Sequence, residues 1–234
     1  MNFGSLLAKL FERIPEWPIK NNIRYFLAFN KLVPSFISDI SPIKGYELNY
    51  NLKEGDIVID AGAFTGDYAV FAAKKVKERG KVIAFEPDSK NRRILIKNLN
   101  HEKIKNVTII PKGLWSKNTT LILNQSQGLH SFLSGENKGD KTGSEKVKVV
   151  KLDDELRRLN IKRVDFIKMD IEGAEIEAIK GSEKILRQYK PRLAIASYHI
   201  VNNKTTSIFL EKYLTGLGYK VKSDFPKHLT TYAS

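Results

Sequence analysis

Residues 56–88, DIVIDAGAFTGDYAVFAAKKVKERGKVIAFEPD, contain the pattern that decides the fold. The β-branched run at 57–59 predicts a buried strand that ends in Asp60. Apolar residues at helical spacing across 68–76 predict a helix, and residues 81–85 predict a second strand. A strand, a helix and a strand in this order predict a βαβ unit, which is the repeating piece of a parallel sheet.

The first turn of this unit has the residues of a ligand-binding loop. Gly62 and Gly66 frame the turn, and Glu86 stands at the tip of the second strand, 20 residues after Gly66. Glycines let the backbone approach a ligand closely, and the start of a helix offers free N–H groups. A carboxylate in the position of Glu86 can accept both ribose hydroxyls of a nucleoside. The pattern therefore predicts a nucleoside-type cofactor.

The remainder of the chain continues the alternation of strands and helices, which predicts an α/β fold with a mostly parallel sheet and helices on both faces. A short strand is predicted at 46–48, before the βαβ unit. Residues 124–146 are rich in Gly, Ser, Asn and Lys and predict a long loop, either functional or mobile. The further strands are predicted at 107–110, 120–123, 147–150, 164–170, 192–196, 219–222 and 229–232, and the further helices at about 88–100, 152–156, 174–186 and 208–217.

Length and composition restrict the class of protein. A chain of 234 residues fits an N-terminal extension, 1–45, followed by one α/β domain, 46–234. The absence of cysteine excludes disulfides, zinc–thiolate sites and a cysteine nucleophile. Since no long apolar run and no signal-peptide pattern occur, we expect a soluble, cytoplasmic protein. The formal net charge is +14, but the basic residues are scattered among acids, so a nucleic-acid groove and a solvated lysine-rich surface both remain open.

The N-terminal extension predicts two helical segments. Residues 2–14 place their apolar side chains on one helical face, and Pro15 and Pro18 end this segment. Residues 21–40 predict the second segment. A lid over the core or a contact in a homodimer fits residues 2–14. A helix on a membrane surface is a further alternative, disfavoured because few basic residues flank the apolar face.

Three stretches together resemble one family. They are IDAGAFTGDYAVFAAK (59–74), VIAFEPD (82–88) and VDFIKMDIEGAEIEAIKG (164–181). The chain resembles FkbM-type methyltransferases, a class I group that depends on S-adenosylmethionine (SAM). The K-x-D-x-E-G-x-E run is the most specific part, and VKVVKLDDEL (147–156) resembles the family's lead into the fourth core strand. The resemblance covers roughly residues 50–200 and leaves the N-terminal 45 residues uncovered.

This resemblance implies a Rossmann-like, seven-stranded sheet whose last strand is antiparallel, with SAM at the carboxyl ends of the strands. It implies an O-methyltransferase that acts on hydroxyls of a glycan, a glycolipid or another small natural product. Family members often have an E-x-H-like ending where this chain reads Ser197, Tyr198, His199, so only the histidine is kept. Glu86 would hold the ribose hydroxyls, and the other cofactor contacts would come from Asp60, Gly62, Ala63, Thr65, Gly66, Tyr68, Pro87, Gly113 and Asp170.

Methyl transfer to an alcohol needs alignment of the reacting atoms and a group that takes the hydroxyl proton. His199, at the tip of the fifth core strand, is the first candidate base, because histidine titrates near neutral pH. The alternative is that His199 only forms a hydrogen bond with a loop and has no part in catalysis. Asp170 and Glu172 are the other catalytic candidates; Asp170 could instead contact the ammonium of SAM, and Glu172 could cap the helix that begins near Ala174. The sequence shows no distinctive set of metal ligands, so we predict no metal.

Several other functions fit the residues less well. Methylation at C5 of a pyrimidine needs a cysteine nucleophile, and amino methylation of bases resembles a [DN]-P-P-[YF] motif where this chain reads D-I-E-G. The G-x-x-x-G loop disfavours an NAD-dependent dehydrogenase, whose loop reads G-x-G-x-x-G. A ribose 2′-O RNA methyltransferase and a non-catalytic module that binds SAM or a nucleotide remain open.

Overall fold

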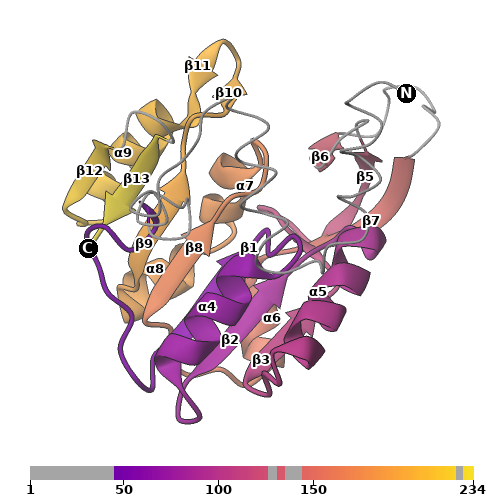
Figure 1. Cartoon of the computed structure of the whole chain (residues 1–234). Helices are drawn as coiled ribbons and strands as arrows, with labels where there is room; N and C mark the ends of the chain where they lie inside the picture. The colour runs from indigo at the N-terminus through magenta and orange to yellow at the C-terminus, as the bar shows by residue number, and fades with distance from the viewer. Residues whose placement is uncertain (1–44, 126–130, 135–143, 225–228) are drawn as a thin grey trace, which may run out of the picture. The chain divides into compact units, whose positions relative to one another are not determined.

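The computed structural model describes residues 45–125, 131–134, 144–224 and 229–234. A seven-stranded sheet lies at the centre of these residues, with the strand order β12-β13-β9-β8-β1-β2-β3 (Figure 1). The helical segments predicted at 2–14 and 21–40 lie outside the described residues. The strands are β1 Ile57–Ala61, β2 Lys81–Phe85, β3 Val107–Ile110, β8 Phe166–Met169, β9 Arg192–Ala196, β12 Val221–Asp224 and β13 Thr230–Ala233.

The sheet is parallel except at one strand. β1 pairs in parallel with both β2 and β8, β2 with β3, and β8 with β9. β13 runs antiparallel to its two neighbours, β9 and β12, as the resemblance implies. The strand order reverses at β1, because β2 and β3 follow on one side and β8 and β9 on the other. Parallel sheets bind ligands outside the carboxyl ends of their strands at such a reversal point, which here lies between β1 and β8.

Helices cover both faces of the sheet, as predicted (Figure 1). Successive side chains of a strand point to opposite faces. Accordingly, Val58 packs with side chains of α4 and α5, whereas its neighbour Ile59 belongs to a second core cluster with side chains of α6 to α9. The helices are α4 Asp67–Val76, α5 Ser89–His101, α6 Leu152–Arg158, α7 Glu175–Lys180, α8 Glu183–Tyr189 and α9 Thr206–Gly216.

The structure corrects two predictions of local structure. A second sheet, in the order β4-β7-β5-β6, includes Ser131–Ser134 as β6, within the segment for which the sequence predicts one loop. That prediction is wrong because β6 pairs antiparallel with β5, the preceding strand, and the polar composition of the segment conceals this pairing. Residues 46–48 form a turn instead of a strand. The other strands are β4 Gly113–Leu114, β5 Thr119–Gln125, β7 Ser144–Val150, and the hairpin of β10 Ile200–Val201 and β11 Lys204–Thr205.

Candidate functional site

The glycine loop between β1 and α4 can be built only with glycine at two positions. Gly62 and Gly66 both have positive φ angles, +75° and +93°. A Cβ atom on Gly62 would lie 1.9 Å from the carbonyl oxygen of Asp170, and one on Gly66 would lie 2.3 Å from Leu95 Cδ1. The N–H groups of Gly62 and Ala63 both donate to the carbonyl oxygen of Phe85, at 3.0 Å. The loop is thus held between the ends of β2 and β8, at the reversal point of the sheet.

Glu86 lies at the end of β2 with its carboxylate turned toward this loop. One oxygen accepts the N–H of Phe64 at 2.7 Å, and the other accepts the N–H of Asp88 at 2.8 Å. The side chain is almost fully buried, and burial raises the pKa of Glu86 to about 7, although these two N–H bonds oppose the shift. Because each carboxylate oxygen has a further lone pair, the group can still accept two hydroxyl donors.

Three further predicted cofactor residues lie near the loop or at the ends of neighbouring strands. Thr65 is buried, and its hydroxyl donates to Asp67 at 3.0 Å. The carbonyl oxygen of Pro87, directly after Glu86, accepts the guanidinium of Arg92. Gly113 opens β4 shortly after the end of β3, so it belongs to the second sheet.

Asp60 and Tyr68 lie in the interior, where they support the loop from behind. Asp60 is fully buried beside Lys168, the residue at the same register of the neighbouring strand β8. Lys168 Nζ also donates to the carbonyl oxygen of Gly62, at 2.8 Å. The Tyr68 hydroxyl is buried and makes no hydrogen bond within the described residues. Sequence analysis missed Lys168, although a lysine inside the apolar strand FIKM was a signal that it has a buried partner.

The three predicted catalytic side chains meet beside this loop. His199, which follows β9, places Nε2 3.3 Å from a carboxylate oxygen of Glu172 and 3.8 Å from one of Asp170. Asp170 follows β8 directly, and it accepts the hydroxyl of Tyr46 at 2.8 Å and that of Tyr198 at 3.4 Å. We call Asp170, Glu172, His199 and the nearby Glu175 the carboxylate–histidine cluster.

Glu175 is a member of this cluster that sequence analysis did not single out. Its side chain is fully buried, and one oxygen lies 3.0 Å from His199 Nδ1. The same oxygen accepts the N–H groups of Ile171 and Gly173, at 3.0 and 3.3 Å. Helix α7 begins at Glu175, and its N-cap residue Ala174 makes no side-chain hydrogen bond, so the suggested capping role of Glu172 stays a prediction. Glu175 instead bonds the loop before the helix, where Glu172 and Gly173 both have positive φ angles.

The surroundings of His199 change its expected titration. Burial lowers its pKa, but the contacts with Glu172 and Glu175 and the charge of Asp170 outweigh burial and raise the pKa to about 10. The expectation of a pKa near neutrality is therefore wrong, and His199 carries a proton at neutral pH in this arrangement. Its catalytic role stays a prediction.

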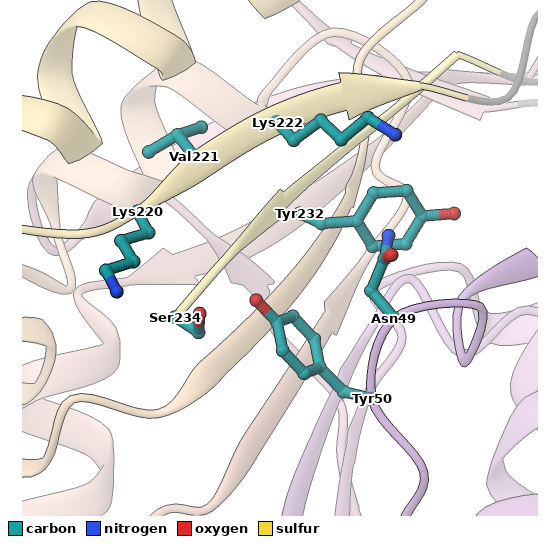
Figure 2. A pocket seen from close by; sticks show the side chains of 7 residues that line it. All are labelled: Asn49, Tyr50, Lys220, Val221, Lys222, Tyr232 and Ser234. Carbon is teal, nitrogen blue, oxygen red and sulfur yellow. The ribbon is translucent and has the colours of Figure 1, made fainter.

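A cavity of about 280 Å³ lies elsewhere on the same domain. Figure 2 shows Tyr50 and Tyr232 facing it, together with Lys220 and Lys222 around β12. Val221 of β12 pairs with Ala233, and Ala233 pairs with Leu193, near the start of β9. The cavity therefore lies toward the amino ends of the parallel strands, opposite the glycine loop.

Known proteins resemble this chain over most of its length. A family model described as the methyltransferase FkbM domain matches residues 60–221. A curated relative, "Methyltransferase sdnD" of Sordaria araneosa, is 29% identical over 201 residues, which are 73% of this chain and 76% of that protein.

Solved structures show the same fold. Methyltransferase FkbM from Methylobacillus flagellatus has a TM-score of 0.61 and 18% identity, and the match covers 92% of this chain. This chain spans only 60% of the length of that protein. Fibrillarin of Aeropyrum pernix, solved with natively bound SAM, has a TM-score of 0.53 and 14% identity, with 84% of this chain and 74% of that chain covered. Within the described residues, no helix combines the length and apolar character needed to cross a membrane.

Proposed function

The chain belongs to the FkbM methyltransferase family, and on this premise we propose that it transfers a methyl group from SAM to a hydroxyl of a glycan, a glycolipid or another small natural product. The observation that carries the choice of a hydroxyl is the carboxylate–histidine cluster beside the glycine loop. A hydroxyl must lose a proton during transfer, and this cluster offers groups that accept one.

SAM is the cofactor of this family, and the residues of the loop fit it. Glu86 can accept the two ribose hydroxyls, because each of its oxygens accepts one backbone N–H and keeps a second lone pair. Gly62 and Gly66 have no side chains, so the nucleoside and the methionine part of SAM could approach the backbone closely there. When bound, SAM supplies a methyl group on a positively charged sulfur, which keeps the electron pair of the broken carbon–sulfur bond.

We assign proton acceptance to Glu172. Its side chain is 28% exposed, compared with 23% for Asp170, 10% for His199 and 0% for Glu175, so it is the most open to an acceptor. The hydroxyl hydrogen passes to the Glu172 carboxylate as the acceptor oxygen bonds to the methyl carbon. His199 and Asp170 orient the acceptor hydroxyl and the Glu172 carboxylate for the reaction. Correct orientation of reacting groups supplies a large part of the rate of a group transfer.

The charge and the exposed side chains around the cluster favour a neutral acceptor over a nucleic acid. Three carboxylates face one histidine here, and like charges of this kind repel the phosphates of RNA. Next to them, Tyr198 is 37% exposed and Ile200 is 73% exposed. These side chains offer apolar surface to a sugar ring or a hydrocarbon, whereas RNA sites combine aromatic side chains with gathered basic residues.

The test is transfer of labelled methyl groups from SAM by the full chain. A panel of glycans, a glycolipid extract, a panel of small natural products with hydroxyl groups and mixed RNA are offered in separate reactions, and the label in each purified fraction is counted. We expect label in the glycan, glycolipid or natural-product fractions, with none above background in RNA. Ile200→Ser should raise the KM of the acceptor and leave the affinity for S-adenosylhomocysteine unchanged, and Ile96→Ser, an exposed isoleucine on α5, is the matched control.

Two other outcomes would overturn the proposal. Label chiefly in RNA, with binding that falls steeply as salt rises, would indicate a ribose 2′-O methyltransferase instead. Binding of SAM without label in any fraction of a broad panel would indicate a non-catalytic module.

A further inference from the structure

The carboxylate–histidine cluster also has the composition of a cation site. We propose that Asp170, Glu175 and His199 bind one divalent transition-metal ion. Binding would release one proton from His199 to the solvent, because a histidine that binds a metal must be neutral. Each of the three offers one ligand atom, and these atoms all lie within 4.8 Å of one another. Two ligands on opposite sides of one such ion lie about 4.2 Å apart, because metal–ligand distances are about 2.0–2.2 Å. A contraction of the cluster would therefore bring the three atoms to coordination distance and leave a position open for a further ligand.

The state of His199 is the second observation that points to a ligand. Its side chain is only 10% exposed, and Glu175 and Glu172 lie 3.0 and 3.3 Å from its two nitrogens. Even so, neither nitrogen makes a hydrogen bond of acceptable geometry within the described residues. Glu175 is fully buried, and its Oε2 atom makes no hydrogen bond there either. Buried polar atoms normally have a hydrogen-bond partner. The unpaired, fully buried Oε2 atom of Glu175, next to a histidine that makes only ion-pair contacts, therefore fits a ligand set for a cation.

The ligands are held in place by groups around them. The Oε1 atom of Glu175 accepts N–H groups of Ile171 and Gly173, which fixes its carboxylate. The hydroxyl of Tyr46 donates to Asp170 Oδ2 at 2.8 Å and limits the rotation of that carboxylate. Metal ligands are commonly oriented in this way by partners behind them, and such partners contribute to affinity. A donor set of one imidazole and two carboxylates suits ions such as Mn²⁺ or Zn²⁺.

A cation here would deepen the proposed function and, in this role, rests on it. It would bind the oxygen of the acceptor hydroxyl and favour loss of its proton. It would also neutralise part of the charge of three adjacent carboxylates. This inference departs from the expectation, drawn from sequence, that no metal takes part.

The experiment measures metal binding without any acceptor. The full chain is freed of metal with a chelator, dialysed and titrated with Mn²⁺ in a calorimeter, while free Mn²⁺ is followed by paramagnetic resonance. We expect one bound Mn²⁺ per chain, with the affinity reduced at least about tenfold in Asp170→Asn and in His199→Gln. His101→Gln is the matched control, because His101 is an exposed histidine 3.5 Å from Glu102. This control should bind Mn²⁺ like the wild type.

Thermal unfolding separates loss of the site from loss of the fold. Mn²⁺ should raise the unfolding midpoint of the wild type and of His101→Gln, and leave those of folded Asp170→Asn and His199→Gln unchanged. The inference is overturned if the wild type binds neither Mn²⁺ nor Zn²⁺ at millimolar concentration, or if the cluster variants bind as tightly as the wild type. Methyl transfer to a hydroxyl by a protein that binds no ion would overturn this inference alone. Ion binding without methyl transfer would overturn the proposed function alone.

Discussion

Lys168 and Asp60 form a buried ion pair between the two central strands. Lys168 Nζ lies 2.9 Å from Asp60 Oδ1, and the two side chains are 6% and 0% exposed. The residues stand at the same register of β8 and β1. Because Lys168 also donates to the carbonyl oxygen of Gly62, one side chain ties the glycine loop to the strand that ends in Asp170. The cofactor loop and the carboxylate–histidine cluster are thus held together by this pair.

Removing one member of this pair should cost much stability. Lys168→Met leaves Asp60 buried without its counter-charge, and the free energy of unfolding should fall by about 3–5 kcal/mol, measured with urea. Adding Asp60→Asn should recover part of the loss, since neither charge is then buried. The control is Lys180→Met, which breaks a half-exposed pair with Glu177 and should cost less than about 1 kcal/mol. Equal losses in the two single variants would contradict the role of Lys168.

Gly62→Ala should distort the loop. Its Cβ would lie 1.9 Å from the carbonyl oxygen of Asp170, and the residue has a positive φ angle. Strain and overpacking should together lower the free energy of unfolding by at least about 2 kcal/mol and weaken binding of S-adenosylhomocysteine. Gly216→Ala is the matched control, because a Cβ added there, at the end of α9, would meet nothing within 4 Å. It should leave stability unchanged or raise it by up to about 1 kcal/mol.

Local patterns in the sequence predicted the elements of the main sheet. The β-branched run at 57–59 and the helical spacing across 68–76 are local signals, so β1 and α4 could be predicted directly. Asp170 and His199 could be predicted as neighbours, because both follow parallel core strands and such ends meet at one edge of a sheet. The boundary at residues 45 and 46 stays a prediction.

Contacts between distant residues could not be predicted in the same way. Asp60 and Lys168 are 108 positions apart, and Tyr46 and Asp170 are 124 apart, so no local pattern joins them. Glu175 was visible in the K-x-D-x-E-G-x-E run, but its contact with His199 depends on the turn before α7. The raised pKa of His199 follows from that same arrangement, which only the folded chain brings together.

The affinity for S-adenosylhomocysteine should depend on pH through Glu86. Its carboxyl group has a pKa of about 7 in the ligand-free protein, and only the charged form accepts both ribose hydroxyls. Binding should therefore strengthen by up to about tenfold between about pH 6 and pH 8. Glu86→Gln should bind more weakly and lose this component of the pH dependence, as calorimetry at several pH values would reveal. The same pH profile in the wild type and the variant would contradict the assignment.

The same group affects stability with the opposite sign. Its folded pKa is raised above the unfolded value of about 4.5, so between these values the folded chain holds a proton that the unfolded chain has lost. The contribution of Glu86 to the free energy of unfolding should thus decline as pH rises from about 4.5 to about 7. Urea titrations of the wild type and Glu86→Gln across this range should differ in slope, with the steeper decline in the wild type.

The last prediction concerns the group that takes the proton. Glu172 is the most exposed carboxylate of the cluster, and it lies in the turn before helix α7, where its backbone has a positive φ angle of 54°. If Glu172 accepts the hydroxyl proton, Glu172→Gln should lower turnover about 10²- to 10⁴-fold, the usual range for loss of a general base. The dissociation constant of S-adenosylhomocysteine should stay within about twofold of the wild type, because Glu86 and the glycine loop are untouched.

The control for this prediction is Glu177→Gln, in helix α7, where Glu177 pairs with Lys180; this variant should retain wild-type turnover. Full turnover in Glu172→Gln together with a large loss in Asp170→Asn would transfer the role to Asp170.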